Sequence, residues 1–160
     1  MSLNFGNTTI LVAEDTPVMA QMIEAILESL GVGNIILTYD GREGFAKYCK
    51  HHPDIVLIDW RMKPIDGLAM VKQIRQDPKS PNPRVPIIMM TGYNAVPRVR
   101  EARDKGVTEY LVKPFSAHDL AKRLAYVVNK PRDFIMANAY FGPDRRRRAD
   151  NSFSGFDKRS

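Results

Sequence analysis

The sequence predicts an α/β protein in which five strands and five helices alternate, (βα)5, with helices on both faces of one open parallel sheet. Five short runs rich in Ile, Val and Leu begin 20 to 31 residues apart. Each run is almost continuously apolar, as in strands that are covered on both faces. The intervals between them show the 3.6-residue period of helices and are long enough for the crossover that parallel strands require.

The five strands can be placed by their composition. They are residues 8–14 (TTILVAE), 34–39 (NIILTY), 54–59 (DIVLID), 85–91 (VPIIMMT) and 107–113 (VTEYLVK). Between the first two strands, apolar residues from Val18 to Leu30 follow the helical period. Thr16 is the expected N-cap of this helix, Pro17 takes its first position, and Gly31 ends it.

Four further helices are predicted by the same reasoning. The apolar residues that mark them are Phe45, Ala46, Tyr48 and Cys49 for the second helix, Leu68, Val71 and Ile74 for the third, Val96, Val99 and Ala102 for the fourth, and Leu120, Leu124 and Val127 for the fifth. The third helix ends before Pro78, and the fourth begins near Pro97. Ser116 and Asp119 have the spacing of a capping box, which places the start of the fifth helix.

Composition and charge divide the chain into two parts. The 160 residues carry a net charge of +6 and one cysteine, Cys49, so an internal disulfide framework is excluded. No run of about 18 apolar residues occurs, and we expect a cytoplasmic protein without membrane insertion. Residues 1–129 hold 16 Lys and Arg against 14 Asp and Glu, whereas residues 130–160 hold 8 against 4. We therefore expect a folded domain over 1–129 and a basic, flexible tail over 130–160.

Polar residues that can carry chemistry stand at the ends of the predicted strands. Glu14 and Asp15 follow the first strand, Asp59 ends the third, Thr91 the fourth and Lys113 the fifth. In an open parallel sheet the carboxyl ends of the strands form the ligand-binding edge. Three carboxylates at one edge repel one another unless a hard cation such as Mg²⁺ lies between them. A carboxylate held there can act as a nucleophile on a phosphoryl group.

These residues resemble the motifs of the receiver domain of two-component response regulators over residues 7–129. The resemblance rests on the Glu14–Asp15 pair, on Asp59 in DIVLIDWRMKPIDG, on Thr91 in IIMMTGY and on Lys113 in EYLVKPF. Four such motifs in this order, each at a predicted strand end, are far more specific than any one alone. The resemblance implies a flavodoxin-like, doubly wound sheet with the strand order 2-1-3-4-5.

The resemblance also implies a role for individual residues. Asp59 would be the phospho-accepting aspartate, and Lys113 would contact the phosphoryl group, with a cis bond to Pro114. Thr91 would be the hydroxyl that moves toward the phosphoryl group. Tyr110 occupies the position of the aromatic switch residue that turns inward when Thr91 moves. A tyrosine in this strand could equally be an ordinary packing residue.

A magnesium site is implied in the same way. Its ligands would be the carboxylates of Glu14, Asp15 and Asp59 and the backbone carbonyl of Arg61. Mg²⁺ is therefore the expected cofactor, bound at the acidic edge where the resemblance also places the phosphoryl group.

The chain departs from the family pattern next to Asp59. The family has a proline four residues after the acceptor, where this chain has Lys63, and the proline follows as Pro64. We therefore expect a different turn in this loop. Arg61 and Tyr93 stand two residues after the acceptor and the switch threonine, at positions that flank the path of attacking water in the family. Two large side chains there predict slow loss of the phosphoryl group.

The implied function is that of a stand-alone response regulator in a phosphorelay. It would accept a phosphoryl group on Asp59 from a sensor histidine kinase or a histidine phosphotransfer protein, and signal to a downstream protein through the fourth helix, fifth strand and fifth helix. It would not be an enzyme beyond catalysing its own phosphorylation and dephosphorylation. A phosphohydrolase is the enzymatic alternative, but such enzymes commonly need a second aspartate where this chain has Arg61.

The basic tail has three possible interpretations. It can be a solvated extension, a docking motif, or an output segment that binds nucleic acid or an acidic protein through Arg145, Arg146, Arg147 and Arg148. Four arginines carry no sequence specificity by themselves. The tail lacks sustained periodicity, so the sequence predicts no helix or strand in it.

Overall fold

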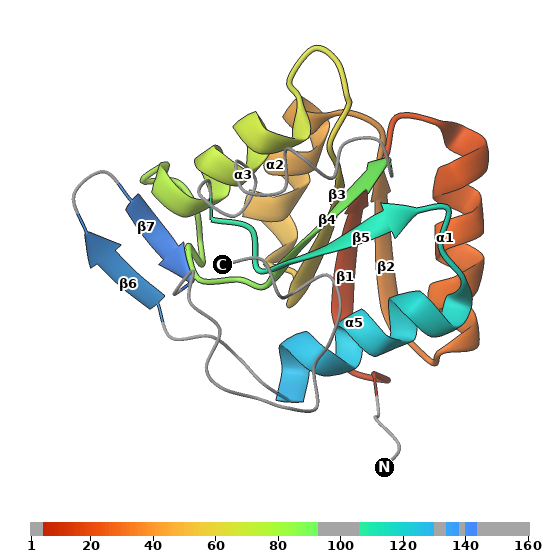
Figure 1. The fold of residues 1–160 in the computed structure, drawn as a ribbon. Coiled ribbons are helices and arrows are strands. Elements are labelled where there is room, and N and C mark those ends of the chain that lie inside the picture. Colours follow the sequence, from red (N-terminus) through yellow and green to blue (C-terminus); the bar gives the residue numbers. More distant parts are fainter. Residues whose placement is uncertain (1–4, 93–105, 130–133, 138–139, 144–160) are drawn as a thin grey trace.

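The computed structural model of the chain describes residues 5–92, 106–129, 134–137 and 140–143. Five parallel strands form one sheet in the order β2-β1-β3-β4-β5, which confirms the predicted topology (Figure 1). The strands are β1 (Thr9–Ala13), β2 (Asn34–Thr38), β3 (Ile55–Asp59), β4 (Ile87–Gly92) and β5 (Glu109–Lys113). The helices are α1 (Pro17–Ser29), α2 (Gly41–His51), α3 (Gly67–Gln76) and α5 (Ala117–Asn129).

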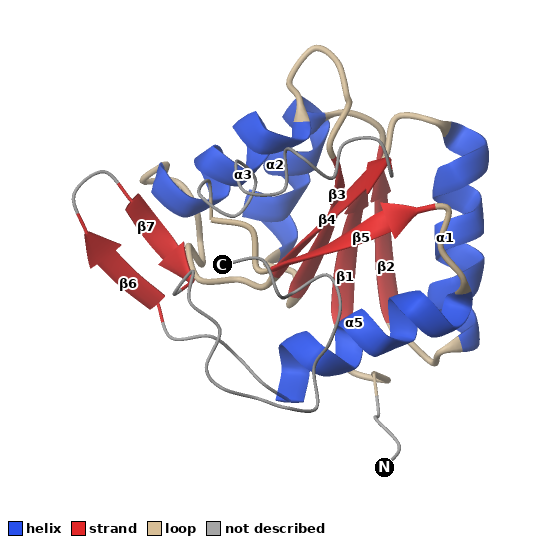
Figure 2. Ribbon diagram, in the orientation of Figure 1, coloured by secondary structure: helices blue, strands red, loops and turns tan. Residues whose placement is uncertain are grey.

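The helices form a layer on each side of the sheet. Figure 2 shows α2 and α3 on one face and α1 and α5 on the other. The predicted fourth helix and Tyr93 fall within residues 93–105, which lie outside the described part of the chain. Among the described residues, no helix has the length and apolar character needed to cross a membrane.

Each face of the sheet has its own hydrophobic core. On one face, Leu11, Ile58 and Met89 are fully buried against α2 and α3. On the other face, Ile10 and Leu57 are buried against α1 and α5. Alternate strand residues thus enter opposite cores, which explains why the strands are apolar throughout instead of alternating.

The helix starts test the capping predictions. Ser116 and Asp119 form the expected capping box, because each backbone N–H donates to the other side chain at 3.0 Å. Thr16 is the N-cap residue of α1, but its side chain makes no capping hydrogen bond. Its N–H instead donates to Oε2 of Glu14 at 3.2 Å. Thr16 therefore holds the predicted N-cap position without a side-chain hydrogen bond, and Pro17 takes the first position of the helix as expected.

A buried arginine ties α3 to the segments that lead into β4 and β5. The Nε of Arg75 donates to the carbonyl of Gly106 at 3.0 Å, and its Nη1 donates to those of Pro83 and Val85 at 2.8 and 2.7 Å. Its Nη2 donates to Oγ1 of Thr108 at 3.3 Å. Arg75 is only 3% exposed. These contacts fix where β4 and β5 begin, at the opposite end of both strands from Thr91 and Lys113.

A two-stranded antiparallel sheet follows α5, where the sequence predicted neither helix nor strand. It consists of β6 (Phe134–Ala137) and β7 (Tyr140–Pro143), and β7 contacts α3. Strands of four residues are too short to produce a recognisable periodicity in the sequence. Residues 144–160, which include the four arginines, lie outside the described residues.

Candidate functional site

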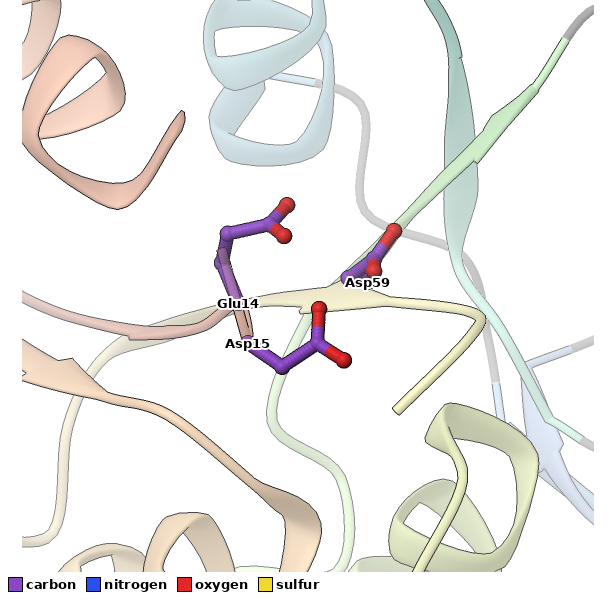
Figure 3. A group of neighbouring side chains, drawn as sticks. All are labelled: Glu14, Asp15 and Asp59. Carbon is purple, nitrogen blue, oxygen red and sulfur yellow. The ribbon is translucent and has the colours of Figure 1, made fainter. Parts of the chain in front are cut away.

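Three carboxyl groups meet where β1 and β3 end. Glu14 and Asp15 directly follow β1, and Asp59 is the last residue of β3, which pairs with β1. Figure 3 shows all three side chains gathered at this edge. One carboxylate oxygen from each lies within 4.8 Å of the others. The sequence placed the same three residues together, because neighbouring parallel strands end at the same edge.

The three carboxyl groups differ in their surroundings. Glu14 is 1% exposed and Asp59 is 7% exposed, whereas Asp15 is exposed to solvent. Hard divalent cations such as Mg²⁺ bind to oxygen ligands and retain several waters. Two enclosed carboxylates and one open to solvent suit such an ion, since its free positions stay accessible. The donor set therefore fits Mg²⁺.

Lys113 at the end of β5 joins two of these carboxylates. Its Nζ lies 2.8 Å from Oε1 of Glu14 and 2.9 Å from Oδ1 of Asp59. The lysine reaches them across β4, which lies between β3 and β5 in the sheet. One ammonium thus offsets part of the repulsion between two enclosed carboxylates.

The environment changes the acidity of both partners. Burial raises the pKa of Asp59 from 3.8 to about 6; Lys113 opposes this shift, and Glu14 and Asp15 add to it. Burial alone would lower the pKa of Lys113, but its contacts with Glu14 and Asp59 outweigh burial, so this pKa is raised. At neutral pH Asp59 is therefore mainly a carboxylate and Lys113 an ammonium.

Thr91 contributes a hydroxyl at the end of β4. It is 1% exposed, and its Oγ1 has no hydrogen-bond partner among the described residues. A buried hydroxyl without a partner is costly, and at a functional site it points to a group that binds there in another state. The next residue, Gly92, stands in register with Lys113. The hydroxyl and the ammonium therefore come from adjacent strand ends.

The loop after Asp59 is held close to the strand. The N–H of Trp60 donates to the carbonyl of Met90 at 3.0 Å, and the N–H of Gly67 donates to that of Trp60 at 2.8 Å. A Cβ atom on Gly67 would lie 2.3 Å from the carbonyl oxygen of Asp59. Only glycine fits this close approach, so Gly67 fixes the start of α3 against the residue that carries the central carboxylate.

A cavity of about 350 Å³ lies beside the acidic cluster. The described residues that line it are Asp15, Trp60, Arg61, Met62, Lys63 and Asp66. The peptide bond between Lys63 and Pro64 is cis, in the loop where the sequence departs from the family pattern. Asp66, which the sequence analysis did not single out, also caps α3, since its Oδ1 accepts from the N–H of Ala69 at 2.8 Å. Its signal was the Asp–Gly step before an apolar helical run.

Of the remaining predicted site residues, Arg61, Tyr110 and Pro114 lie within the described part of the chain. Tyr93 and the four arginines of the tail lie outside it. Tyr110, the second residue of β5, is 2% exposed, and its Cα pairs with that of Met89. The Lys113–Pro114 peptide bond is cis, as expected.

The side chains at this edge of the sheet provide a carboxylate that can act as a nucleophile, an ammonium, a hydroxyl and oxygen ligands for a cation. Together these groups suit phosphoryl transfer.

Comparison with known proteins places most of the chain in one family. The family model of the response regulator receiver domain matches residues 10–125. Chemotaxis protein CheY-3 of Vibrio cholerae is 31% identical over 118 residues, covering 74% of this chain and 89% of that protein. Transcriptional regulatory protein ZraR of Salmonella typhimurium is 33% identical over 128 residues, or 80% of this chain and 28% of that protein. The chain spans between a quarter and a half of the length of the first curated relatives it matches.

Solved structures agree with this result. The receiver domain of sensor histidine kinase PA1611 from Pseudomonas aeruginosa, with a magnesium ion coordinated in its active site cleft, aligns with a TM-score of 0.67 and 34% identity. The alignment covers 77% of this chain and 98% of that domain. CheY4 of Vibrio cholerae aligns with a TM-score of 0.68 and 30% identity, over 75% of this chain and 98% of that one.

Proposed function

The chain belongs to the family of response regulator receiver domains, and we propose that Asp59 is the residue that accepts its phosphoryl group. The observation that carries this proposal is the position of Asp59 at the end of β3. There its Oδ1 lies 2.9 Å from the ammonium of Lys113, and its carboxylate belongs to the cluster with Glu14 and Asp15. Glu14 shares the burial, the ammonium and the acidic neighbours, but it follows β1, whereas Asp59 is itself the last residue of a strand.

In the proposed reaction a carboxylate oxygen of Asp59 attacks the phosphorus of a phosphohistidine on a partner protein. A P–O bond forms to Asp59 as the P–N bond to the imidazole breaks, and the imidazole leaves with the electron pair of that bond and takes up a proton from solvent. The attacking group must be ionised. The pKa of Asp59, raised by burial to about 6, still leaves it mostly ionised at neutral pH.

Two further side chains act on the charge of the phosphoryl group. Lys113 already contacts Asp59 and can follow the negative charge onto the phosphoryl oxygens as the new bond forms. The hydroxyl of Thr91 is buried and lacks a partner among the described residues, so it can donate to one of these oxygens. Loss of this hydroxyl would weaken the response to phosphorylation more than phosphorylation itself.

We assign the magnesium site of this chain to Glu14, Asp15 and Asp59, with the backbone carbonyl of Arg61 as a further ligand. Mg²⁺, when bound, supplies positive charge that offsets the negative charge of the phosphoryl oxygens. The oxygen donors of the cluster and the solvent-exposed position of Asp15 support this assignment.

The donor would be a sensor histidine kinase or a histidine phosphotransfer protein. The signal would leave through β5 and α5, together with the segment 93–105 that precedes β5. Tyr110 is fully enclosed in β5, and Nη1 of Arg123 on α5 pairs with Oε1 of Glu109 at 3.2 Å. A shift of Thr91 on the neighbouring strand would change the packing of this face and bias an existing equilibrium. The chain would thus be a phosphoacceptor and not a turnover enzyme.

Treatment with a small-molecule phosphodonor and Mg²⁺, followed by intact mass measurement, tests the proposal. The wild type should gain one phosphoryl group, and Asp59→Asn should gain none. Asp66→Asn is the matched control, because Asp66 lines the neighbouring cavity and asparagine preserves its N-cap. It should gain one group like the wild type. Equal phosphorylation of Asp59→Asn, or none in the wild type, would refute the role of Asp59.

A further inference from the structure

The hairpin β6–β7 is an addition to the receiver fold. It lies beyond residues 10–125, which match the family, and it approaches the domain through the contact of β7 with α3. Pro143 at the end of β7 is buried. Figure 1 shows β6 as the strand farther from α3. Within the described residues β6 pairs with β7 alone, and no described strand pairs with the backbone groups of its other edge.

The register of the hairpin indicates which backbone groups face outward. The paired residues are Phe134 with Pro143, Ile135 with Gly142, Met136 with Phe141 and Ala137 with Tyr140. Proline has no N–H, so the pair of Phe134 with Pro143 fits the type that exchanges no hydrogen bonds. The two types alternate along an antiparallel ladder, so the pair of Met136 with Phe141 is of the same type. Phe134 and Met136 therefore direct their N–H and C=O groups away from β7.

The sequence leaves the β6 edge without the usual protection against pairing. Residues 134–143 read FIMANAYFGP and contain no charged residue. Natural proteins protect open edges with lysine, other charges or proline. β7 ends in Pro143, but β6 has none of these devices. An isolated two-stranded sheet is also marginal in water, so additional strands would stabilise it.

We propose that β6 pairs antiparallel with β6 of a second copy of this chain. The result is a four-stranded sheet in the order β7-β6-β6-β7 across a two-fold axis. Phe134 of each copy then exchanges hydrogen bonds with Met136 of the other, and Ile135 lies opposite Ile135 on the axis. Each copy keeps its own contact between β7 and α3.

A second copy fits this edge because the pairing is self-complementary. Both strands present the same outward groups at the same spacing, and neither brings a charged residue opposite a like charge. A two-fold arrangement of this kind is closed, so it gives a dimer and not a fibre. Strands of four residues make a small interface, so the dimer is weak and depends on protein concentration.

Cysteine cross-linking of the full chain tests the predicted register. In a Cys49→Ser background, Ile135→Cys places two thiols opposite each other, with Cα atoms about 4.5 Å apart, within disulfide range. In the matched variant Ala137→Cys the two residues are separated by about 13 Å along the strands, too far for a disulfide. Mild oxidation should cross-link the first variant and not the second. Equal cross-linking of both, or none of the first, would overturn the proposal.

Sedimentation over a range of protein concentrations tests the pairing itself. The wild type should show a reversible dimer. Met136→Pro removes an outward N–H without removing a bond to β7 and should weaken association at least about tenfold. Met136→Thr keeps the N–H and should still dimerise. A wild type that stays monomeric throughout, or a proline variant that dimerises as well as the wild type, would contradict the proposal. Neither result depends on the phosphorylation of Asp59.

Discussion

At the scale of single residues, opposing effects act on the pKa of Asp59. Burial and the acidic neighbours Glu14 and Asp15 raise its pKa to about 6, although Lys113 opposes them. A carboxyl group with a higher pKa in the folded than in the unfolded chain binds more protons when folded. Stability therefore falls as the pH rises from about 4 to about 6, and then stays constant as far as this group is concerned. The ionised carboxylate of Asp59 therefore lowers the free energy of unfolding at neutral pH.

Asp59→Asn should therefore stabilise the protein at neutral pH in the absence of divalent cations. The expected gain in the free energy of unfolding is about 1–3 kcal/mol at pH 7.5, from a shift of about two pKa units. The difference should shrink toward zero near pH 4, where Asp59 is protonated in the folded wild type. Urea unfolding at several pH values measures it. A variant no more stable than the wild type at pH 7.5 would contradict the raised pKa.

The residues of the site were predictable, but their contacts were not. Glu14, Asp15, Asp59, Thr91 and Lys113 all stand at strand ends in the sequence, and parallel strands bring such ends to one edge. The spacing of residues in the sequence does not show which carboxylates Lys113 contacts, because those contacts depend on how far its side chain extends across β4. The unpaired hydroxyl of Thr91 and the raised pKa of Asp59 follow from burial, which also needs the folded structure.

At the scale of secondary-structure elements, Arg75 holds the ends of β4 and β5 that lie farthest from the acidic cluster. Its guanidinium is buried and donates to three backbone carbonyls and to Thr108. Gly106, one of these acceptors, has φ of +102°, and a Cβ there would come within 3.2 Å of the Arg75 side chain. The arginine and the glycine therefore form one connection between α3 and the segment that enters β5.

Arg75→Met should destabilise the protein by about 2–4 kcal/mol, because it leaves buried carbonyls without donors. Lys72→Met is the matched control on the same helix, since Lys72 is exposed. It should change the free energy of unfolding by less than about 0.5 kcal/mol. Chemical denaturation of both variants measures the difference. A cost for Arg75→Met no larger than for the control would show that these hydrogen bonds contribute little.

The sequence predicted whole elements better than their details. All five strands of the large sheet occur where the apolar runs stand, because long runs of Ile, Val and Leu have few alternatives in an α/β chain. The hairpin of β6 and β7 was not predicted, because its strands are short. They also lie in residues 130–160, which were expected to be flexible because of their charge. The division into a domain over 1–129 and a flexible tail over 130–160 remains a prediction.

At the scale of the whole molecule, cation binding should couple to folding. An ion bound by Glu14, Asp15 and Asp59 stabilises the folded state in proportion to the logarithm of its concentration above the dissociation constant. Millimolar Mg²⁺ should therefore raise the melting temperature of the wild type by a few degrees. Asp15→Asn removes the solvent-exposed carboxylate that we propose as a ligand, and it should abolish most of this shift. Differential scanning fluorimetry with and without Mg²⁺ measures both; an equal shift in the variant would remove Asp15 from the site.

The architecture as a whole was accessible from the sequence because several signals agreed. The order of apolar runs, the helix caps and the positions of the polar residues all led to one doubly wound sheet. The hairpin of β6 and β7, which lies beyond the residues that match the family, was not predicted. Nothing in its sequence shows that β7 would contact α3, because that contact depends on the path of the chain after α5.

The most direct test of the central claim is to locate the phosphoryl group within the chain. Borohydride reduces an aspartyl phosphate to homoserine, so the protein can be phosphorylated with a small-molecule donor and Mg²⁺, reduced, digested and sequenced by mass spectrometry. Homoserine is expected at position 59, and Glu14, Asp15 and Asp66 should remain unmodified. Modification at another carboxylate, with Asp59 unchanged, would contradict this expectation.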